Sequence, residues 1–406
     1  MLFNQAQGGL VMQPRLERLS HLIGTPLFES IMWGHEYDLS GLNRVLENKI
    51  KSGHFKRIVF YGMGCSSVIS DMMKGFFKSQ EIPIHVDVVN DYDTEWFVQN
   101  SVLRDESTLV IIVCYSGWSC EPIMFYERVR ELAGNKNLIV LSGGGKIADL
   151  ARSDGTSLIV YQLRHADREY PLYHVQQFFS IFLDLFYKLK ITSSTYEKEL
   201  RDSVSFLKET FDDSMVGRAR GIAQKLHDCN IAFLATPRWY VPLLKQTTMF
   251  FNEIAMVPAH RNLLHEFSHT EVAALSSPKN KLAMVVFEDV DEDAYTRAKI
   301  DIFERVLGDK SQPKNKQIEL VVLKLDQKNF FQKFFFAHFF MMYVAYYLGQ
   351  YVDAEGRDLI SITAGNPWWS QEAIDAHPNC VNIPGKLDTG GVTEIAAVMA
   401  AAEAAE

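Results

Sequence analysis

Short apolar runs without polar interruption recur along this chain and alternate with helix-like segments. In the first half they span residues 57–64, 84–90, 108–116, 137–143 and 157–163. Such runs are typical of parallel strands whose two faces are both covered by helices. Strand–helix alternation at this spacing predicts βαβ units and a doubly wound sheet.

The second half repeats the pattern. Strands are expected at residues 230–237, 281–289 and 318–325, with helices at 243–257 and 291–308 between them. A long helix is predicted over residues 173–191, followed by a polar connection at 192–203. The fold class is therefore α/β, with two tandem doubly wound domains of parallel sheets flanked by helices.

These patterns also predict the domain boundaries. We expect an N-terminal helical lead at residues 1–40, a first domain at 41–195 and a second domain at 196–352. Residues 353–406 alternate turn signals with short helical pieces and form a divergent C-terminal segment.

Composition limits the functional classes. The chain has 406 residues, of which 47% are hydrophobic, so it is long enough to bury large cores. Its net charge of -9 argues against nucleic acid as the main partner.

The five cysteines form no CxxC pair and no disulfide framework, and the N-terminus lacks the apolar core of a signal peptide, so we expect a cytoplasmic protein. The apolar segment 330–349 contains Lys333 and His338, which favours a buried helix over a membrane span.

Two strand ends carry unusual turns. "GMGCSS" (62–67) follows the first strand and "CYSGWSCEP" (114–122) follows the third. In parallel sheets ligands bind beyond the carboxyl ends of strands, and the free amides at a helix N-terminus favour anions. Neither turn is a Walker loop or a GxGxxG motif, and each by itself could be an ordinary strand-to-helix turn. Together these two hydroxyl-rich turns, the second of which offers Ser116 and Ser119, predict one phosphate site.

A series of motifs extends this interpretation. In order they are "GMGCSS", "NDYDTEWF", "VCYSGWSCE", "LSGGGKIADLA", "DREYPLY", "FFNEIAMVPAHRN" and "EFSHTEV". Their order and spacing resemble those of the sugar-isomerase (SIS) domain family, and within it the bifunctional phosphoglucose/phosphomannose isomerases. The resemblance covers residues 40–350 approximately, and the series is far more specific than any one motif.

The resemblance implies a site and a function. The phosphate cradle corresponds to Gly64, Cys65, Ser66, Cys114, Ser116, Gly117 and Ser119. The family's catalytic glutamate corresponds to Glu253, its enediolate-stabilising arginine to Arg168, and its ring-opening histidine, which the partner subunit contributes, to His269. The implied protein is a homodimer with shared active sites that isomerises a phosphorylated sugar, with no cofactor, metal or membrane.

The residue types suit this chemistry. Aldose–ketose interconversion needs a base beside a carbonyl, and we expect burial in "MFFNEIAM" to raise the pKa of Glu253 toward neutrality. A permanent cation such as Arg168 stabilises an enediolate, and a histidine such as His269 titrates near neutral pH. The alternatives are an ion pair between Arg168 and a neighbouring acid, and a surface or capping role for His269.

The chain also departs from the family. Cys65 and Cys114 replace a glycine and a serine, and Trp118 replaces an asparagine. Cys65 is either a nucleophile with a lowered pKa at a helix N-terminus or a small packing residue. The family's C-terminal substrate contacts have no clean equivalent; residues 366–377 are the nearest match. An isomerase is therefore the first hypothesis. The alternatives are a non-catalytic sugar-phosphate-binding regulator and a biosynthetic enzyme with redirected chemistry.

Overall fold

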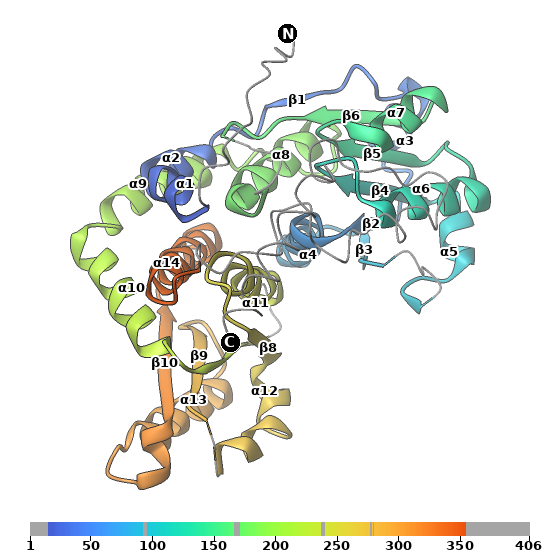
Figure 1. Cartoon of the computed structure of the whole chain (residues 1–406). Coiled ribbons are helices and arrows are strands. Elements are labelled where there is room, and N and C mark those ends of the chain that lie inside the picture. Colours follow the sequence, from blue (N-terminus) through green and yellow to red (C-terminus); the bar gives the residue numbers. More distant parts are fainter. Residues whose placement is uncertain are drawn as a thin grey trace, which may run out of the picture.

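The computed structural model describes residues 15–91, 96–165, 171–236, 240–276, 278 and 280–354. Within these residues the chain is an α/β protein, as expected, with two sheets flanked by helices (Figure 1). The first sheet contains β1 (Tyr37–Asp38), β2 (Arg57–Gly62), β3 (His85–Val89), β4 (Thr108–Cys114), β5 (Leu138–Ser142) and β6 (Ser157–Tyr161). The second contains β7 (Asn230–Ala235), β8 (Ala259–Leu263), β9 (Leu282–Asp289) and β10 (Ile318–Leu325).

The helices alternate with these strands. Up to the first sheet's last strand they are α1 (Arg15–Leu22), α2 (Thr25–Ser30), α3 (Arg44–Lys51), α4 (Gly64–Ser79), α5 (Asn100–Arg104), α6 (Cys120–Ala133) and α7 (Gly145–Ser153). Later helices are α8 (Val175–Lys188), α9 (Glu197–Thr210), α10 (Asp213–Leu226), α11 (Tyr240–Met249), α12 (Leu264–Phe267), α13 (Ala294–Gly308) and α14 (Phe330–Tyr351). Short helical turns are η2 (Pro171–His174), the π-helical turn η3 (Phe250–Ile254), η4 (Glu271–Ser276) and η5 (Pro313–Gln317).

Each apolar run identified in the sequence forms a strand, and the strands they form pair in parallel. Two strands were not predicted. β1 pairs antiparallel with β6 at one edge of the first sheet, so this sheet is mixed. β8 has the sequence "AHRNL" and no fully buried residue, so it lacks the apolar signal by which the other strands were found.

Two further expectations are corrected. The polar connection predicted at 192–203 is helical from Glu197, because Leu200, Ser203 and Leu207 form a buried stripe on α9. The segment around His269 was expected to be a loop-rich excursion, but its first part forms β8 and α12. A short element in a polar sequence carries no local apolar pattern, so it cannot be predicted when tertiary contacts are what stabilise it.

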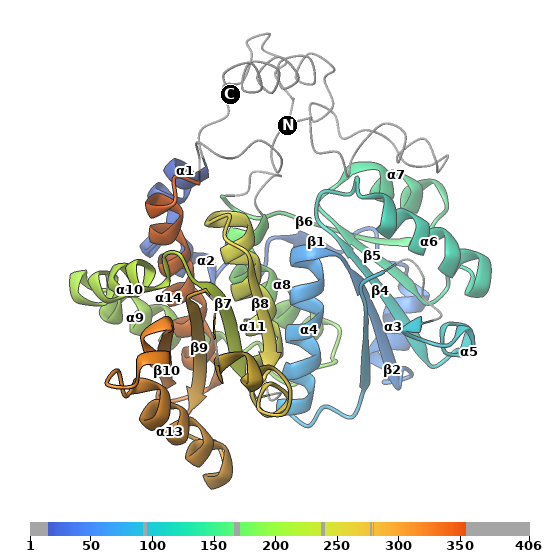
Figure 2. The same cartoon turned by 60° about the horizontal axis from the view of Figure 1, so that its bottom comes forward.

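Helices cover both faces of the first sheet. Along β2, Ile58 and Phe60 face the side occupied by α3, α4 and α8, whereas Val59 and Tyr61 face α5, α6 and α7 (Figure 2). The same alternation in the second sheet sends Phe233 toward α10, α11 and α14, and its neighbour Leu234 toward α12 and α13. Both sheets are therefore buried on two faces, as the continuous apolar runs predicted.

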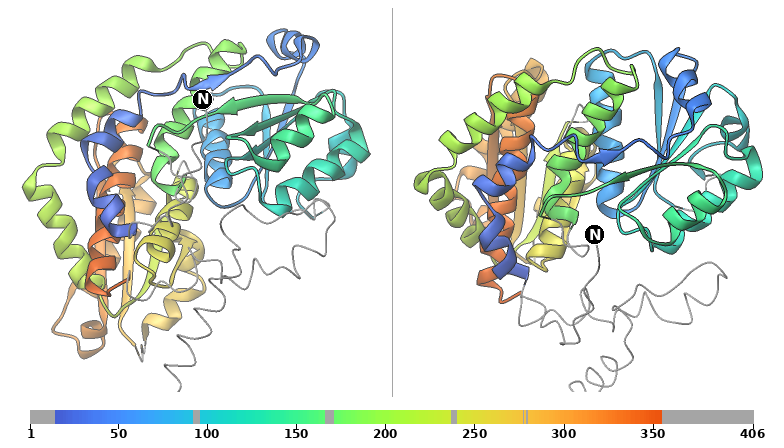
Figure 3. Two further views of the ribbon diagram at one scale, coloured as in Figure 1. Left: turned by 45° about the horizontal axis from the view of Figure 1, so that its top comes forward. Right: turned by 90° about the horizontal axis from the view of Figure 1, so that it is seen from above.

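One apolar cluster joins the two sheets. Helix α4 lies between the first sheet and α11 of the second half, and the cluster includes side chains from both (Figure 2). Helix α14 is buried along most of its length, as predicted, and the N-terminal helix α1 lies beside it (Figure 3). There Leu16 approaches Gly349, where an added Cβ would stand 3.2 Å from a methyl carbon of Leu16. Among the described residues no helix is long and apolar enough to cross a membrane.

Candidate active site

The first sheet reverses its winding between β2 and β4. Its strand order is β1-β6-β5-β4-β2-β3, so the chain moves from β2 outward to β3 and then crosses to the other side of β2. Helix α4 therefore covers one face and α5 and α6 the other; in open α/β sheets such a reversal leaves a crevice at the carboxyl ends of the two strands, which here are β2 and β4. Ligands of open α/β sheets bind at such a point. Both predicted phosphate turns lie there.

The turn after β2 is built for a close approach of backbone. Gly62 ends the strand, and an added Cβ there would lie 2.7 Å from the carbonyl carbon of Ser66. Gly64 begins α4 with φ +51°, a conformation that favours glycine. The hydroxyl of Ser67 donates to the carbonyl of Gly64 at 2.8 Å and fixes the first turn. Met63 at the N-cap supplies no side-chain cap, so the first amides of the 16-residue helix α4 have no capping side chain.

The turn after β4 is organised around the thiol of Cys114. Burial raises the pKa of this thiol, while hydrogen bonds from the amides of Gly117 and Ser119 and from the hydroxyl of Ser116 oppose that shift. Part of the donor set predicted for phosphate is therefore directed at the sulfur. Ser119 is the N-cap residue of α6, and within the described residues its hydroxyl caps no amide of that helix.

Glycines of the next turn support this loop. Gly117 has φ +73°, and an added Cβ would lie 1.7 Å from the carbonyl oxygen of Gly144. The amide of Gly143 donates to the carbonyl of Tyr115 at 3.0 Å, and that of Ile147 to the carbonyl of Gly117 at 3.0 Å. The "SGGG" run after β5 thus holds the predicted phosphate loop in place. This supporting role of the motif was not predicted from the sequence.

Glu253 lies on the π-helical turn that ends α11. Phe250, Phe251 and Ile254 of this turn are buried, and Glu253 points outward and is exposed. The expected burial of Glu253 is therefore wrong, because the apolar neighbours occupy the inward face of the turn. π-helical turns of this kind are frequent at functional sites. Met256, two residues beyond the turn, has φ +53°, which is rare for a side chain of this size.

Glu253 lies close enough to the first turn to act on it electrostatically. Burial raises the pKa of the Cys65 thiol well above its ordinary value, and the negative charge of Glu253 raises it further. Cys65 is therefore a packing residue rather than the low-pKa nucleophile considered from sequence. Gly64 confirms the proximity of α11, since its Cβ position is 4.0 Å from Cε of Met249. Glu253 and Cys65, about 190 residues apart in the sequence, therefore lie near enough for their charges to interact.

Lys245 was missed in the sequence. It lies on α11, two turns before Glu253, and its ammonium group is 2.9 Å from the carboxylate of Asp71 on α4. Its positive charge also acts on the Cys65 thiol, where it opposes part of the rise in pKa that burial and Glu253 cause. No local pattern marks this lysine, because its significance comes from the packing of α11 on α4.

The remaining predicted site residues differ in burial and in whether the structure describes them. Arg168 lies outside the described residues. Ser66 is buried in the first turn of α4. His269 is exposed after α12, and its backbone amide donates to the carbonyl of Glu266 at 3.0 Å. Among the described residues, Cys65, Cys114 and Cys229 are free thiols, whereas Cys120 is disulfide-bonded, a bond that was not predicted from the sequence.

The second sheet reverses its winding between β7 and β9, and the polar side chains at the ends of these strands are paired within the chain. The hydroxyl of Thr236 donates to the carboxylate of Glu292, and both residues are buried. The ammonium of Lys333 lies 2.5 Å from Asp289 and 2.5 Å from Asp291. These ion pairs satisfy the buried charges internally, so the first sheet's crevice is the better ligand site.

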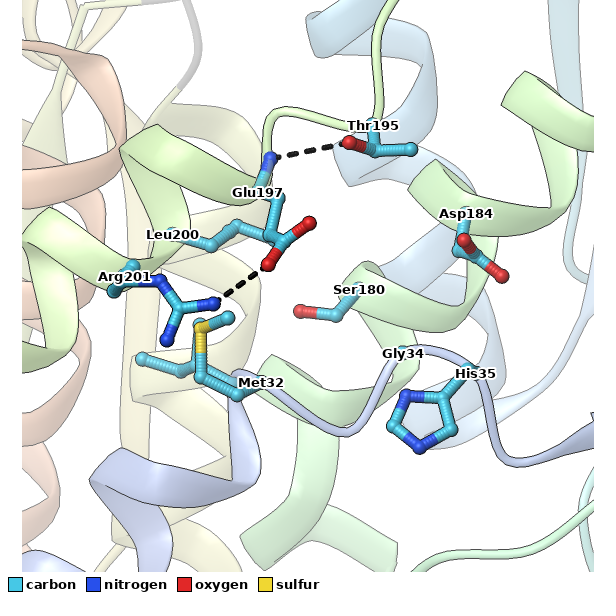
Figure 4. Close-up of a pocket in the computed structure, with 10 residues that line it drawn as sticks. Met32, Gly34, His35, Ser180, Asp184, Thr195, Glu197, Leu200 and Arg201 are labelled. Atoms are coloured by element: carbon cyan, nitrogen blue, oxygen red, sulfur yellow. Dashed lines mark hydrogen bonds and ion pairs between the residues drawn. The ribbon is translucent and has the colours of Figure 1, made fainter.

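A separate cavity of about 350 Å³ lies between the segment after α2, helix α8 and the start of α9 (Figure 4). Its charged groups are paired within the chain: Glu197 with Arg201 at 2.6 Å, and Asp184 with Lys188 at 2.9 Å. None of the predicted site residues is among those that line it. We therefore do not include it in the candidate site.

Comparison with known proteins agrees with the fold and the resemblance. Residues 215–363 match the family described as the bacterial phospho-glucose isomerase C-terminal SIS domain. A bifunctional phosphoglucose/phosphomannose isomerase of Aquifex aeolicus is 26% identical over 257 residues, which are 63% of this chain and 74% of that protein. A D-glucosamine-6-phosphate 4-epimerase of Sulfolobus acidocaldarius is 26% identical over 248 residues, 58% of this chain and 71% of that protein.

Solved structures share the fold. The tagatose-6-phosphate ketose/aldose isomerase of Escherichia coli aligns with a TM-score of 0.54 at 14% identity, over 83% of this chain and 92% of that one. The C-terminal domain of a glucosamine-fructose-6-phosphate aminotransferase from Francisella tularensis aligns with a TM-score of 0.55 at 13% identity, over 84% of this chain and 97% of that one. The resemblance to the SIS domain family noted in the sequence is confirmed.

Proposed function

We propose that this protein is an aldose–ketose isomerase of a phosphorylated sugar. The observation that carries the proposal is the electrostatic proximity of Glu253, from the second half of the chain, to Cys65 in the turn after β2, together with the adjacent position of the turn after β4. A sugar phosphate places an anion and a reacting carbonyl a few bonds apart. The turns would bind the anion, and the carboxylate would face the carbons next to it.

In the proposed reaction Glu253 takes the proton from C2 of the open-chain aldose and returns it to C1. The electron pair released at C2 forms the C1–C2 double bond of an enediolate, and the carbonyl oxygen at C1 takes the negative charge. The proton of the C2 hydroxyl then moves to the oxygen at C1, so the negative charge lies on the oxygen at C2, and protonation at C1 leaves the C2 carbonyl of the ketose. Arg168, by resemblance, supplies a fixed cation for that charge. His269 would carry the proton needed to open the sugar ring. Both roles rest on the family's motif.

The exposure of Glu253 bears on assembly. A general base works best when it is partly shielded from water, which adjusts its pKa toward the working pH. Within this chain Glu253 and His269 are both exposed. A homodimer in which the partner subunit covers Glu253 and brings His269 to it would supply the shielding, and we include this shared site in the proposal. A cytoplasmic location is also part of it.

A second candidate reaction follows from the Sulfolobus relative. That protein is named a D-glucosamine-6-phosphate 4-epimerase, and it matches this chain at the same identity as the isomerase does. The altered residues Cys65, Cys114 and Trp118 lie in the two turns of the cradle and change its polarity. Epimerisation at C4 of an amino-sugar phosphate is therefore the alternative.

The test is incubation of the protein with a panel of aldose, ketose and amino-sugar phosphates in deuterated water. The proposal expects interconversion with deuterium at C1 or C2. Glu253→Gln should lower this turnover by at least about 100-fold, since it removes a general base, whereas Glu266→Gln on the exposed part of α12 should not. Inversion at C4 without exchange at C1 or C2 would favour the epimerase, and binding without turnover would favour a regulator.

A further inference from the structure

Helices α4 and α11 join the two halves of the candidate site. Helix α4 starts at the phosphate-binding turn of the first sheet, and α11 ends in the turn that bears Glu253. Gly64 lies level with Met249, and Asp71 lies level with Lys245. Residue numbers rise along α4 as they fall along α11, so the two helices run antiparallel. A shift of one along the other would change the separation between Glu253 and the turn.

The apolar contacts between the helices leave this register loosely defined. Hydrophobic burial is non-directional and depends on area rather than on one alignment. Met72, Met73 and Phe76 of α4 are buried in the apolar cluster that both halves share, and Met249 of α11 packs against that cluster. Flexible methionine side chains in particular adapt to small displacements. Such a contact holds the helices together but does not by itself fix their alignment.

An ion pair crosses the same boundary. Nζ of Lys245 lies 2.9 Å from Oδ2 of Asp71, and the two side chains are only 13% and 20% exposed. A charge-assisted hydrogen bond of this length has a defined direction, and partial burial reduces the screening by water. By contrast, the ion pair between Lys208 of α9 and Glu29 of α2 has 41% and 47% exposed side chains.

We propose that the Asp71–Lys245 ion pair is a positioning device that fixes the register of α11 along α4, and so sets the separation between Glu253 and the phosphate-binding turns. This inference rests on the proposed function in that Glu253 is taken as the base. Asp71 and Lys245 need not touch the substrate. They act through the placement of Glu253, and a misplacement of about 1 Å costs on the order of 100-fold in rate.

Three variants test this role. Lys245→Met and Asp71→Asn each remove the ion pair, and Lys245→Arg keeps a cation that can reach Asp71. We expect the first two to lower kcat by at least about 10-fold while the Kd for the sugar phosphate and for inorganic phosphate changes by less than about 3-fold, because the predicted phosphate turns lie wholly in the first sheet. Lys245→Arg should restore most of kcat. Lys208→Met, which breaks the exposed pair, is the matched control and should leave kcat unchanged.

Hydrogen exchange gives a readout that does not need activity. Peptides covering residues 246–257 should exchange faster in Lys245→Met than in the wild type, because the π-helical turn loses its anchor. A folded Lys245→Met protein with unchanged kcat, or one in which kcat and thermal stability fall together and Lys245→Arg restores neither, would overturn the positioning role. If the wild type isomerises no sugar phosphate, the proposed function fails. The exchange result then decides the inference alone: faster exchange supports the fixed register, and unchanged exchange rejects it.

Discussion

Cys114 shows how one substitution changes the chemistry of a binding loop. Its sulfur receives hydrogen bonds from the amides of Gly117 and Ser119 and from the hydroxyl of Ser116. Sulfur is a weak acceptor, so these donors remain available to a stronger anion that displaces it. These donors therefore surround the position at which we expect the phosphate to bind.

The two serines of this loop should respond differently to removal. Ser119→Ala deletes a hydroxyl that caps nothing in the described chain, so it should weaken phosphorylated ligands by about 1.5–3 kcal/mol without loss of stability. Ser116→Ala should weaken binding and also lower the melting temperature, because Ser116 bonds to Cys114 and accepts from the amide of Trp118 at 3.4 Å. Calorimetric titration with a sugar phosphate, together with thermal unfolding, measures both. Ser153→Ala on exposed α7 is the control, and unchanged affinity in Ser119→Ala would contradict the phosphate assignment.

At the scale of elements, helix α14 carries two polar residues through the core in different ways. Lys333 is neutralised by Asp289 and Asp291, whereas neither ring nitrogen of His338 has a hydrogen-bond partner in the described part of the chain. His338 instead packs between the rings of Phe250 and Phe339, with centroids 5.3 and 4.6 Å away. We therefore expect replacement of Lys333 to destabilise the fold, whereas replacement of His338 by an apolar residue should not.

Removal of Lys333 should destabilise the fold. Burial lowers the pKa of Lys333, but the hydrogen bonds that Lys333 donates to Asp289 and Asp291 and the charges of these carboxylates outweigh burial and raise it, so the lysine is charged in the native state. Lys333→Met leaves Asp289 buried beside an uncharged side chain, and we expect a loss of about 3–5 kcal/mol in the free energy of unfolding. Urea unfolding measures the loss, and Lys333→Met/Asp289→Asn should recover part of it. A loss below about 1 kcal/mol would contradict the view that this pair is needed once both charges are buried.

His338 should make stability depend on pH. Burial lowers the pKa of His338 to about 3, well below the value of about 6.5 in an unfolded chain. Between these values the unfolded state binds a proton that the native state does not. Stability is therefore full above pH 6.5 and falls by up to about 1.4 kcal/mol per pH unit as the pH drops toward 3.

His338→Leu checks this sign. The variant should lose less stability than the wild type between pH 7 and pH 5, and it should be at least as stable at pH 7 because it removes a buried polar ring without partners. Urea unfolding at several pH values gives the comparison. His174, whose pKa burial also lowers to about 3, remains in both proteins, so the slope should decrease but not vanish. Equal slopes in the two proteins would show that His338 does not contribute.

At the scale of the whole molecule, Glu253 and His269 of the candidate site are exposed to solvent in a single chain. We expect a homodimer in which each site combines Glu253 of one subunit with His269 of the other. Glu253→Gln and His269→Ala should each be inactive alone. When the two variants are mixed and allowed to exchange subunits, half of the dimers contain one intact site, so activity should return to about a quarter of the wild-type value.

Light scattering supplies the independent check on assembly. A monomer at micromolar concentration, or mixed variants that stay inactive after subunit exchange is shown to have occurred, would remove His269 from the proposed site. Activity in the His269→Ala protein alone would do the same. The wild-type dimer measured at the same total concentration is the reference for both experiments.

The sequence by itself determined the elements and the first half of the site. Uninterrupted apolar runs predict strands because successive side chains point to opposite faces of a sheet and helices cover both faces. The glycines at 62 and 117 mark close backbone approaches that a Cβ would block, and Gly64 has a positive φ that favours glycine. The turns after β2 and β4 were therefore predictable, as was the buried helix α14. The short strands β1 and β8 were not, since they carry no such pattern.

Only the tertiary structure decided how the second half meets the first. The apolar context of Glu253 suggested burial, but local sequence does not state which face of a helical turn points inward, and the π-helical geometry directs this residue outward. The pairing of Asp71 with Lys245 joins residues 174 positions apart. No local pattern encodes such a contact, because it arises when two helices, each specified by its own apolar stripe, pack at one register out of several that burial alone would allow.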